Sequence, residues 1–324
     1  MIHFDIFGNL SDLLKENNTS PYISVPHYMV MPFGMVIVME NVISICLLYA
    51  CTRLCFQIRI MSLNLAISDF LMGISICIPN TLLNEKYHCD IKKYPGFLFI
   101  TVSLFIITTM NVDRCCVFAL AMRYYSFITK KLIINISVAL WVMGLLVTFG
   151  TFFDLKDKYG LSCIVMTDVK RNAVTLTCRS ILLIILTFNL IMFIYFMYQV
   201  RKRLGRISDT SDRAQSTTFA REQARISGKT SLIIGVFLIA FFPFMITCSF
   251  PFDPDSETFR KTFSIVVMIM LFNSACNPIF YVWRFSEPRY HLKRILCFWN
   301  KKQRLEIENK YNQENASYTI DLKK

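Results

Sequence analysis

The chain of 324 residues is 54% hydrophobic, has a mean hydropathy of +0.46 and carries a formal net charge of +13. Soluble globular proteins are usually ~45–50% apolar, with their apolar residues spaced at helix or strand periods. Here these residues form long continuous blocks, which argues against a soluble domain and against a membrane β-barrel, whose strands alternate apolar and polar residues.

Each block is about as long as the ~20 residues that a helix needs to cross the hydrocarbon core of a bilayer. In chain order the seven blocks are 28–51, 60–83, 94–121, 132–153, 176–199, 229–252 and 262–283. They make up about half of the chain and leave only short loops and tails. We therefore predict an all-α membrane protein, with one seven-transmembrane helix bundle over residues 28–283.

The segment 284–299, after the last block, has apolar residues on one side and basic residues on another. This pattern predicts a short amphipathic eighth helix that lies on the membrane surface. Cys297 near its end is a candidate for lipidation, and an unmodified interfacial cysteine is the alternative. The polar tail 300–324 is predicted to be disordered.

Basic residues gather in the loops after the first, third, fifth and seventh blocks, whereas the other loops mix both signs. Because basic loops tend to stay in the cytoplasm, we expect a multi-pass plasma membrane protein with an extracellular N-terminal tail, 1–27. Sequons at Asn9, Asn17 and Asn18 agree with a glycosylated tail on that side. The basic loops could bind a partner, or simply orient the protein and contact membrane lipids.

Polar side chains interrupt the apolar blocks. Such side chains are unfavourable in lipid, so they usually face the bundle interior and mark function. Interhelical hydrogen bonds without a further role are the alternative. In chain order these residues are Glu40, Asn41, Asn64, Asp69, Ser103, Asn111, Asp113, Arg114, Asn273, Ser274 and Asn277.

Several of them stand in motifs. The run Leu65-Ala-Ile-Ser-Asp69, the triplet Asp113-Arg114-Cys115 and the run Asn277-Pro278-Ile-Phe-Tyr281 resemble three signatures of rhodopsin-like (class A) G-protein-coupled receptors. Asn41 and Trp141 fit single residues of that family's first and fourth helices. The resemblance covers about residues 28–298 and implies that the chain passes the signal of an extracellular ligand to a heterotrimeric G protein.

The resemblance also implies roles for single residues. Asp113 would hold Arg114 in the resting receptor, and Arg114 would meet the G protein on activation. The other expected switch residues are Tyr195, Asn277, Pro278 and Tyr281. A pivot is expected in the sixth helix, where proline kinks the backbone, at Phe237, Phe241 and Pro243.

Two further sites are implied by the same family. Cys89 and Cys163 would form a disulfide on the outer face. A sodium ion could act as an allosteric modulator in a polar network, and a water-filled network is the alternative. The residues of this network are Asn41, Asp69, Ser103, Asn273, Ser274 and Asn277.

The implied ligand pocket is mostly apolar. Its positions are Lys92, Lys93, Gly96, Phe97, Ile100, Phe244, Met245, Val267 and Leu271. Amine receptors of the family carry an aspartate where Gly96 stands, so a lipid-like or peptide ligand is favoured over an amine. The two lysines could pair with an anionic head group or be solvated in an outer loop.

Two departures leave an alternative open. Cys115 replaces the usual tyrosine and Phe241 the usual tryptophan, which fits a receptor-like protein that does not couple and acts as a decoy or dimer partner. A transporter that relays ions through Asp69 and Glu40 is less favoured, because internal repeats and glycine-rich broken helices are lacking. We expect no enzyme activity, since no nucleophile–base or metal constellation stands out, and no nucleic-acid partner.

Overall fold

The computed structural model describes residues 27–78, 88–120, 124–158, 173–209, 234–247 and 257–321, and no strand occurs within these ranges. The first helices are α2 (His27–Ala50), α3 (Phe56–Cys77), α4 (His88–Leu120), α5 (Tyr124–Phe127), α6 (Lys130–Lys158) and α7 (Ala173–Asp209). They are followed by an unlabelled helix, Ile234–Thr247, and by α9 (Glu257–Arg284), α10 (Ser286–Leu296) and α11 (Lys301–Asp321).

Six of these helices contain an apolar stretch long enough to cross a membrane, and the shorter Ile234–Thr247 helix falls in the remaining predicted block. Many of their apolar side chains point outward: Leu146, Phe149, Ile184 and Ile191 are all at least 60% exposed. Such a surface suits lipid rather than water as the surrounding solvent. The prediction of an all-α seven-helix bundle with a short helix after it is confirmed.

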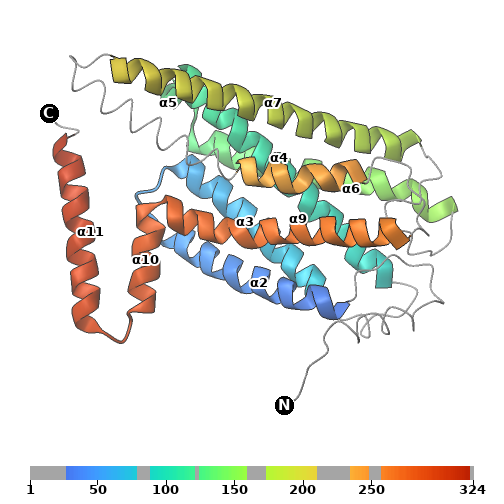
Figure 1. Cartoon of the computed structure of the whole chain (residues 1–324), viewed down its shortest axis with the longest axis horizontal. Helices are drawn as coiled ribbons and strands as arrows, with labels where there is room; N and C mark the ends of the chain where they lie inside the picture. Colours follow the sequence, from blue (N-terminus) through green and yellow to red (C-terminus); the bar gives the residue numbers. More distant parts are fainter. Residues whose placement is uncertain are drawn as a thin grey trace.

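The helices pack as one bundle (Figure 1). α3 contacts α2, α4, α6 and α9, while α4 contacts α6 and α7. α10 turns across one end of the bundle, where it contacts α2 and α9, and α11 lies beside α10. We call this end the α10 end.

Small residues let neighbouring helices approach closely, which is how helices associate in lipid. A Cβ atom on Gly73 of α3 would lie 2.9 Å from a methyl carbon of Val38 and 3.1 Å from the carbonyl oxygen of Gly34, both on α2. A Cβ atom on Gly144 of α6 would overlap Val102 of α4. These glycines therefore set the spacing of α2 to α3 and of α4 to α6.

The expectation of a disordered tail is wrong for Lys301–Asp321, which forms α11. The Asn300 side chain accepts a hydrogen bond from the backbone N–H of Gln303 at 3.2 Å, which caps the helix start. The ring of Tyr311 stacks on Tyr290 of α10 at 4.2 Å between centroids. Capping and stacking together hold a segment whose composition alone predicts no packed structure.

Candidate functional site

A hydrogen-bonded pair links α3 to α9 in the middle of the bundle. The Asn277 side chain donates to Oδ2 of Asp69 at 2.7 Å, and the Ser274 side chain also hydrogen-bonds to this carboxylate. Asn41 of α2 donates to the backbone carbonyls of Ile37 at 2.9 Å and of Ser274 at 3.4 Å. The first two helices and α9, which is distant from them in the sequence, therefore meet at these polar side chains.

A cavity of about 20 Å³ lies beside this pair. One water needs a cavity of roughly 10–15 Å³, so the space suits a single small polar guest. Its polar lining comes from Asp69, Ser103, Asn273, Ser274 and Asn277. Among the described residues, Oδ1 of Asn273 is buried without a hydrogen-bond partner. One carboxylate with hydroxyl and amide oxygens is a donor set that fits a sodium ion as well as a water.

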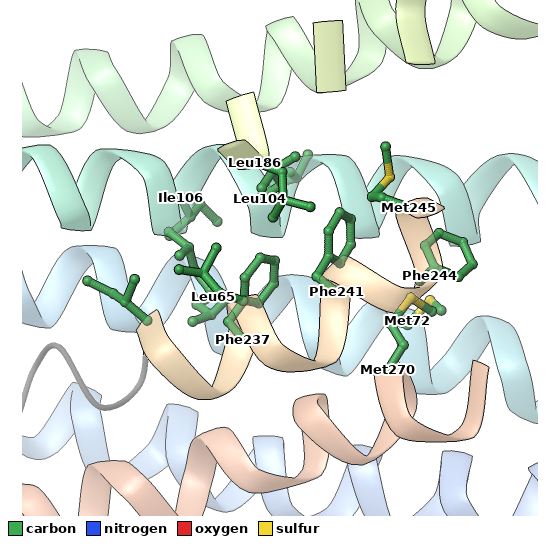
Figure 2. Packing of buried hydrophobic residues seen from close by; sticks show 14 of the residues in the cluster. Leu65, Met72, Leu104, Ile106, Leu186, Phe237, Phe241, Phe244, Met245 and Met270 are labelled. Atoms are coloured by element: carbon green, nitrogen blue, oxygen red, sulfur yellow. The ribbon is translucent and has the colours of Figure 1, made fainter. Parts of the chain in front are cut away.

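The helix Ile234–Thr247 closes the other side of this cavity with aromatic rings. Phe237 and Phe241 line it and stack on each other at 5.0 Å between centroids. Figure 2 shows the two rings near Leu104 of α4 and Leu186 of α7. Pro243 follows Phe241 by two residues, so the point where a proline interrupts the helix ladder directly adjoins the polar cavity.

Arg114 lies near the α10 end of α4 and is only 7% exposed. Its guanidinium pairs with the carboxylate of Asp113, which also accepts a hydrogen bond from the hydroxyl of Tyr124 on α5. Burial, and next the hydrogen bond to Asp113, raise the pKa of Tyr124 above its usual value, so the phenol stays protonated as a donor. The motif predicted the Asp113–Arg114 contact, whereas Tyr124 stands outside the motif and was missed.

A second polar contact missed by sequence reasoning joins α4 to α7. The side chain of Asn111 donates to the backbone carbonyl of Asn189 at 3.0 Å, and Asn189 donates to the hydroxyl of Thr108 at 2.8 Å. Asn189 is fully buried. An amide in an apolar block was the available signal, and this one was overlooked because it belongs to no motif.

Asn64 and Trp141 join α3 to α6. The indole N–H of Trp141 donates to Oδ1 of Asn64 at 2.9 Å, and the Asn64 amide lies 3.3 Å from the hydroxyl of Ser137. The ring of Trp141 also meets Phe99 edge-on, at 6.4 Å between centroids. The tryptophan singled out in the sequence thus has a partly buried polar partner, as an indole inside a protein needs.

Glu287 of α10 fastens that helix to the loop between α2 and α3. Its carboxylate accepts hydrogen bonds from the backbone N–H groups of Thr52 (2.9 Å), Arg53 (3.1 Å) and Leu54 (2.8 Å). This residue is buried, at 7% exposure, within a helix that lies at the end of the bundle. The contact makes α10 part of the bundle rather than an appendage.

Ligand atoms of Cys51, Glu287 and His291 lie within 4.8 Å of one another, a spacing that a metal ion could use. The Glu287 carboxylate, however, has about four acceptor sites and already accepts four hydrogen bonds. Burial, with the Glu287 charge as the next cause, raises the pKa of the Cys51 thiol to about 12, so it stays protonated. The cluster therefore has a structural role: it connects α10 to the loop between α2 and α3.

Tyr195, a predicted switch residue, lies mostly exposed on α7. Its side chain is 55% exposed on α7, whereas the next residue, Phe196, is 2% exposed and packs on Phe118 and Cys115 of α4. Without a proline in α7, the ordinary helix period places Phe196 on the inward face. The role of Tyr195 stays a prediction.

The residues of the expected ligand pocket converge on one apolar cluster. Phe97, Phe244, Met245 and Leu271 are buried in it, and Ile100 and Val267 pack partly buried against it. Figure 2 shows Phe244 beside Met72 and Met270. Gly96 lies on α4 near this cluster, at 4.0 Å from Met72 for an added Cβ atom.

Some predicted residues cannot be placed. The side chains of Cys89, Lys92, Lys93 and Tyr281 lie outside the described part of the structure, although their backbones belong to α4 and α9. Asn9, Asn17, Asn18 and Cys163 fall outside the described residues. The disulfide, the glycosylation sites and the cationic mouth of the pocket therefore stay predictions, as does lipidation of Cys297, a free thiol just after α10.

The bundle and its polar interior have the architecture of a seven-helix membrane receptor. The family described as 7 transmembrane receptor (rhodopsin family) matches residues 40–281, most of the chain. The chain belongs to this family, which is a family of G-protein-coupled receptors rather than of enzymes.

Individual relatives agree with this assignment. Melanocortin receptor 5 of Rattus norvegicus is 23% identical over 286 residues, which cover 82% of each chain. Melanocortin receptor 4 of Danio rerio is 21% identical over the same length and coverage. Trace amine-associated receptor 5 of Rattus norvegicus is 25% identical over 260 residues, 72% of this chain and 73% of that receptor.

Proposed function

We propose that this receptor lies in the plasma membrane with its N-terminus outside and transduces an extracellular signal to a heterotrimeric G protein. The observation that carries the proposal is the contact of the buried Arg114 with Asp113, which Tyr124 also hydrogen-bonds, at the α10 end. By the bias of basic loops this end faces the cytoplasm. The guanidinium of Arg114 can therefore bind a cytoplasmic partner only after its contact with Asp113 opens.

The physical basis is a two-state contact. A buried ion pair is unfavourable to break by removing one partner, yet it can be exchanged for another set of contacts. The Tyr124 hydroxyl strengthens the resting set, because it donates to the carboxylate that holds Arg114. A ligand shifts the balance only by binding the open state more tightly than the resting state.

The link from ligand to switch would run through the helix Ile234–Thr247. Its outer part contributes Phe244 and Met245 to the apolar cluster, and its middle places Phe241 against the polar cavity. Pro243 gives this helix a point at which it can bend. A ligand that displaces Phe244 would therefore move Phe241 and Phe237 and disturb the packing around Asp69.

We also propose that the cavity beside Asp69 holds a sodium ion in the resting receptor. Asp69, Ser103, Ser274 and the unpaired Oδ1 of Asn273 would hold it, and a bound cation would supply positive charge next to the buried carboxylate. The residues themselves keep Asp69 and Asn277 in contact between α3 and α9.

The ligand we propose is lipid-like or a peptide rather than an amine. The candidate pocket positions with described side chains are apolar, and Gly96 provides no carboxylate for a cationic ligand. The relatives include receptors named for melanocortins as well as one named for association with trace amines. The absence of a charged group at position 96 supports a ligand other than an amine.

The test is basal and ligand-stimulated G-protein activation in transfected cells, across lipids, peptides and amines. Arg114→Ala should abolish the signal, and Asp113→Asn should raise basal activity several-fold because Arg114 loses its partner. Lys310→Ala, at an exposed basic residue of α11, is the control and should retain the signal. Silence of the well-expressed wild type and of Asp113→Asn toward every G-protein class would favour the non-coupling alternative, a decoy or dimer partner.

A further inference from the structure

A groove of about 420 Å³ lies at the α10 end, away from the polar interior. It runs between the last turns of α2, the outer side of α10 and the start of α11. Figure 1 shows α10 and α11 side by side at this end of the bundle. The lining residues that matter here are Leu47, Ala50, His291, Arg294, Phe298 and Arg304.

One part of the groove is apolar and the other is cationic. Leu47, Ala50 and Phe298 belong to the apolar part of the lining, and Arg294 and Arg304 belong to the cationic part. Neither arginine has an ion-pair partner among the described residues, and no acidic side chain lines the groove. The groove therefore offers two uncompensated positive charges next to an apolar wall.

His291 adds a polar group without adding charge. Burial lowers the pKa of its imidazole, and the neighbouring Arg294 lowers it further, against the opposite effect of the Glu287 carboxylate. The ring is neutral at physiological pH and can donate one hydrogen bond.

The groove sits at the boundary between hydrocarbon and water. Its α2 residues are the last ones of the membrane span Val30–Ala50. Ile295, Leu296, Phe298 and Trp299 are all more than half exposed at the end of α10, as side chains that enter a membrane surface are. A molecule in the groove would thus contact the head-group layer with one end and the acyl layer with the other.

We propose that this groove binds a phosphoinositide of the adjacent leaflet, with its phosphates on Arg294 and Arg304 and its acyl chain along Ala50 and Phe298. A guanidinium group binds phosphate oxygens through two parallel hydrogen bonds (bidentate binding), which the single ammonium group of lysine cannot match. Two of them suit a headgroup with more than one phosphate charge. The apolar wall selects a lipid over a soluble phosphate, because a free anion gains nothing from it.

Binding is tested on the full-length chain in phosphatidylcholine nanodiscs that contain a small fraction of a photo-crosslinkable phosphatidylinositol bisphosphate. Crosslinks should map to the end of α2 and to α10, and unlabelled lipid should compete for them. Arg294→Gln combined with Arg304→Gln should weaken binding roughly 10- to 30-fold. Because no G protein or agonist is present, the result is independent of the proposed signalling function.

Two matched variants separate the groove from general attraction. Lys301→Gln combined with Lys302→Gln removes the same charge from exposed residues of α11 outside the groove, and should change binding less than about 3-fold. Ala50→Trp fills the groove without changing charge and should weaken binding about 10-fold or more. Thermal unfolding of each variant in lipid-free detergent verifies that it is folded.

Four outcomes would overturn the proposal. Equal losses in the two double variants would show diffuse attraction to anionic membranes only. Unchanged binding in folded Ala50→Trp would show that the lipid does not enter the groove. Competition by the soluble inositol phosphate headgroup as strong as that by the lipid would show an anion site without lipid recognition. Phosphatidylserine at matched surface charge should compete weakly, and equal competition would likewise exclude a phosphoinositide site.

Discussion

The α10 end of the bundle and the opposite end are held by different kinds of contact. At the α10 end, Glu287 accepts hydrogen bonds from three successive backbone N–H groups, and Asp113 bridges Arg114 and Tyr124. At the opposite end, rings and methionines such as Phe244 and Met270 meet without directional bonds (Figure 2). Polar contacts demand one partner geometry, whereas apolar contacts demand mainly volume.

This difference suits the two tasks of a receptor. A switch needs two discrete arrangements, which hydrogen bonds and ion pairs supply because a half-made polar network is unfavourable. A pocket needs a shape that substitutions can adjust, which an apolar cluster supplies. We therefore expect isosteric substitutions to be harmful at the α10 end and in the polar links between helices, and tolerated at the opposite end.

The largest effect is expected for Glu287→Gln. The amide keeps the shape of the side chain but loses the charge and one acceptor oxygen, so part of the backbone at Thr52–Leu54 loses its partners. The stability should fall by about 2–3 kcal/mol, measured as thermal unfolding in detergent. Glu306→Gln on the exposed side of α11 is the control and should stay within about 0.5 kcal/mol. Equal stability of the two variants would contradict a stabilising role for the hydrogen bonds of Glu287.

A smaller effect is expected for Asn189→Leu. Leucine has nearly the same size, but it removes the donor to Thr108. It also removes the side-chain oxygen that accepts from Asn111, which keeps only the backbone carbonyl of residue 189 as its acceptor on α7. Interhelical hydrogen bonds in membranes contribute up to roughly 1–2 kcal/mol, so the stability should fall by about 1 kcal/mol. A double-mutant cycle with Thr108→Val measures the contact itself. Additive losses in that cycle would mean that the two side chains do not interact.

The smallest effect is expected for Met270→Leu at the opposite end. Both side chains have similar volumes, and Met270 contacts the apolar cluster without a directional bond. The stability should change by less than about 1 kcal/mol, while the potency of ligands that enter the pocket should shift. Unfolding and dose–response curves measured on the same variant separate the two effects. A loss as large as that of Glu287→Gln would remove the contrast between the two ends.

Much of this architecture followed from local properties of the sequence. Hydropathy over ~20 residues determines whether a segment can cross a bilayer, and no tertiary contact is needed to read it. The residues of the polar cavity were found in the same way, because Asp69 and Asn277 are unfavourable in lipid and stand in motifs that resemble one receptor family. The ion pair of Asp113 and Arg114 could be predicted because the two residues are neighbours in the sequence.

Other features were decided by tertiary structure. Glu287 looks like an ordinary solvated acid of an amphipathic helix, and its partners at Thr52–Leu54 lie more than 230 residues away. Tyr124 becomes a hydrogen-bond partner of Asp113 only because α5 brings it back onto that residue. The order in α11 depends on the stack of Tyr311 on Tyr290. The basic groove exists only because α2, α10 and α11 lie next to one another. The sequence by itself determined which segments enter the membrane, since transfer into lipid depends on composition. The fold decided which polar groups meet, since a hydrogen bond depends on distance and direction.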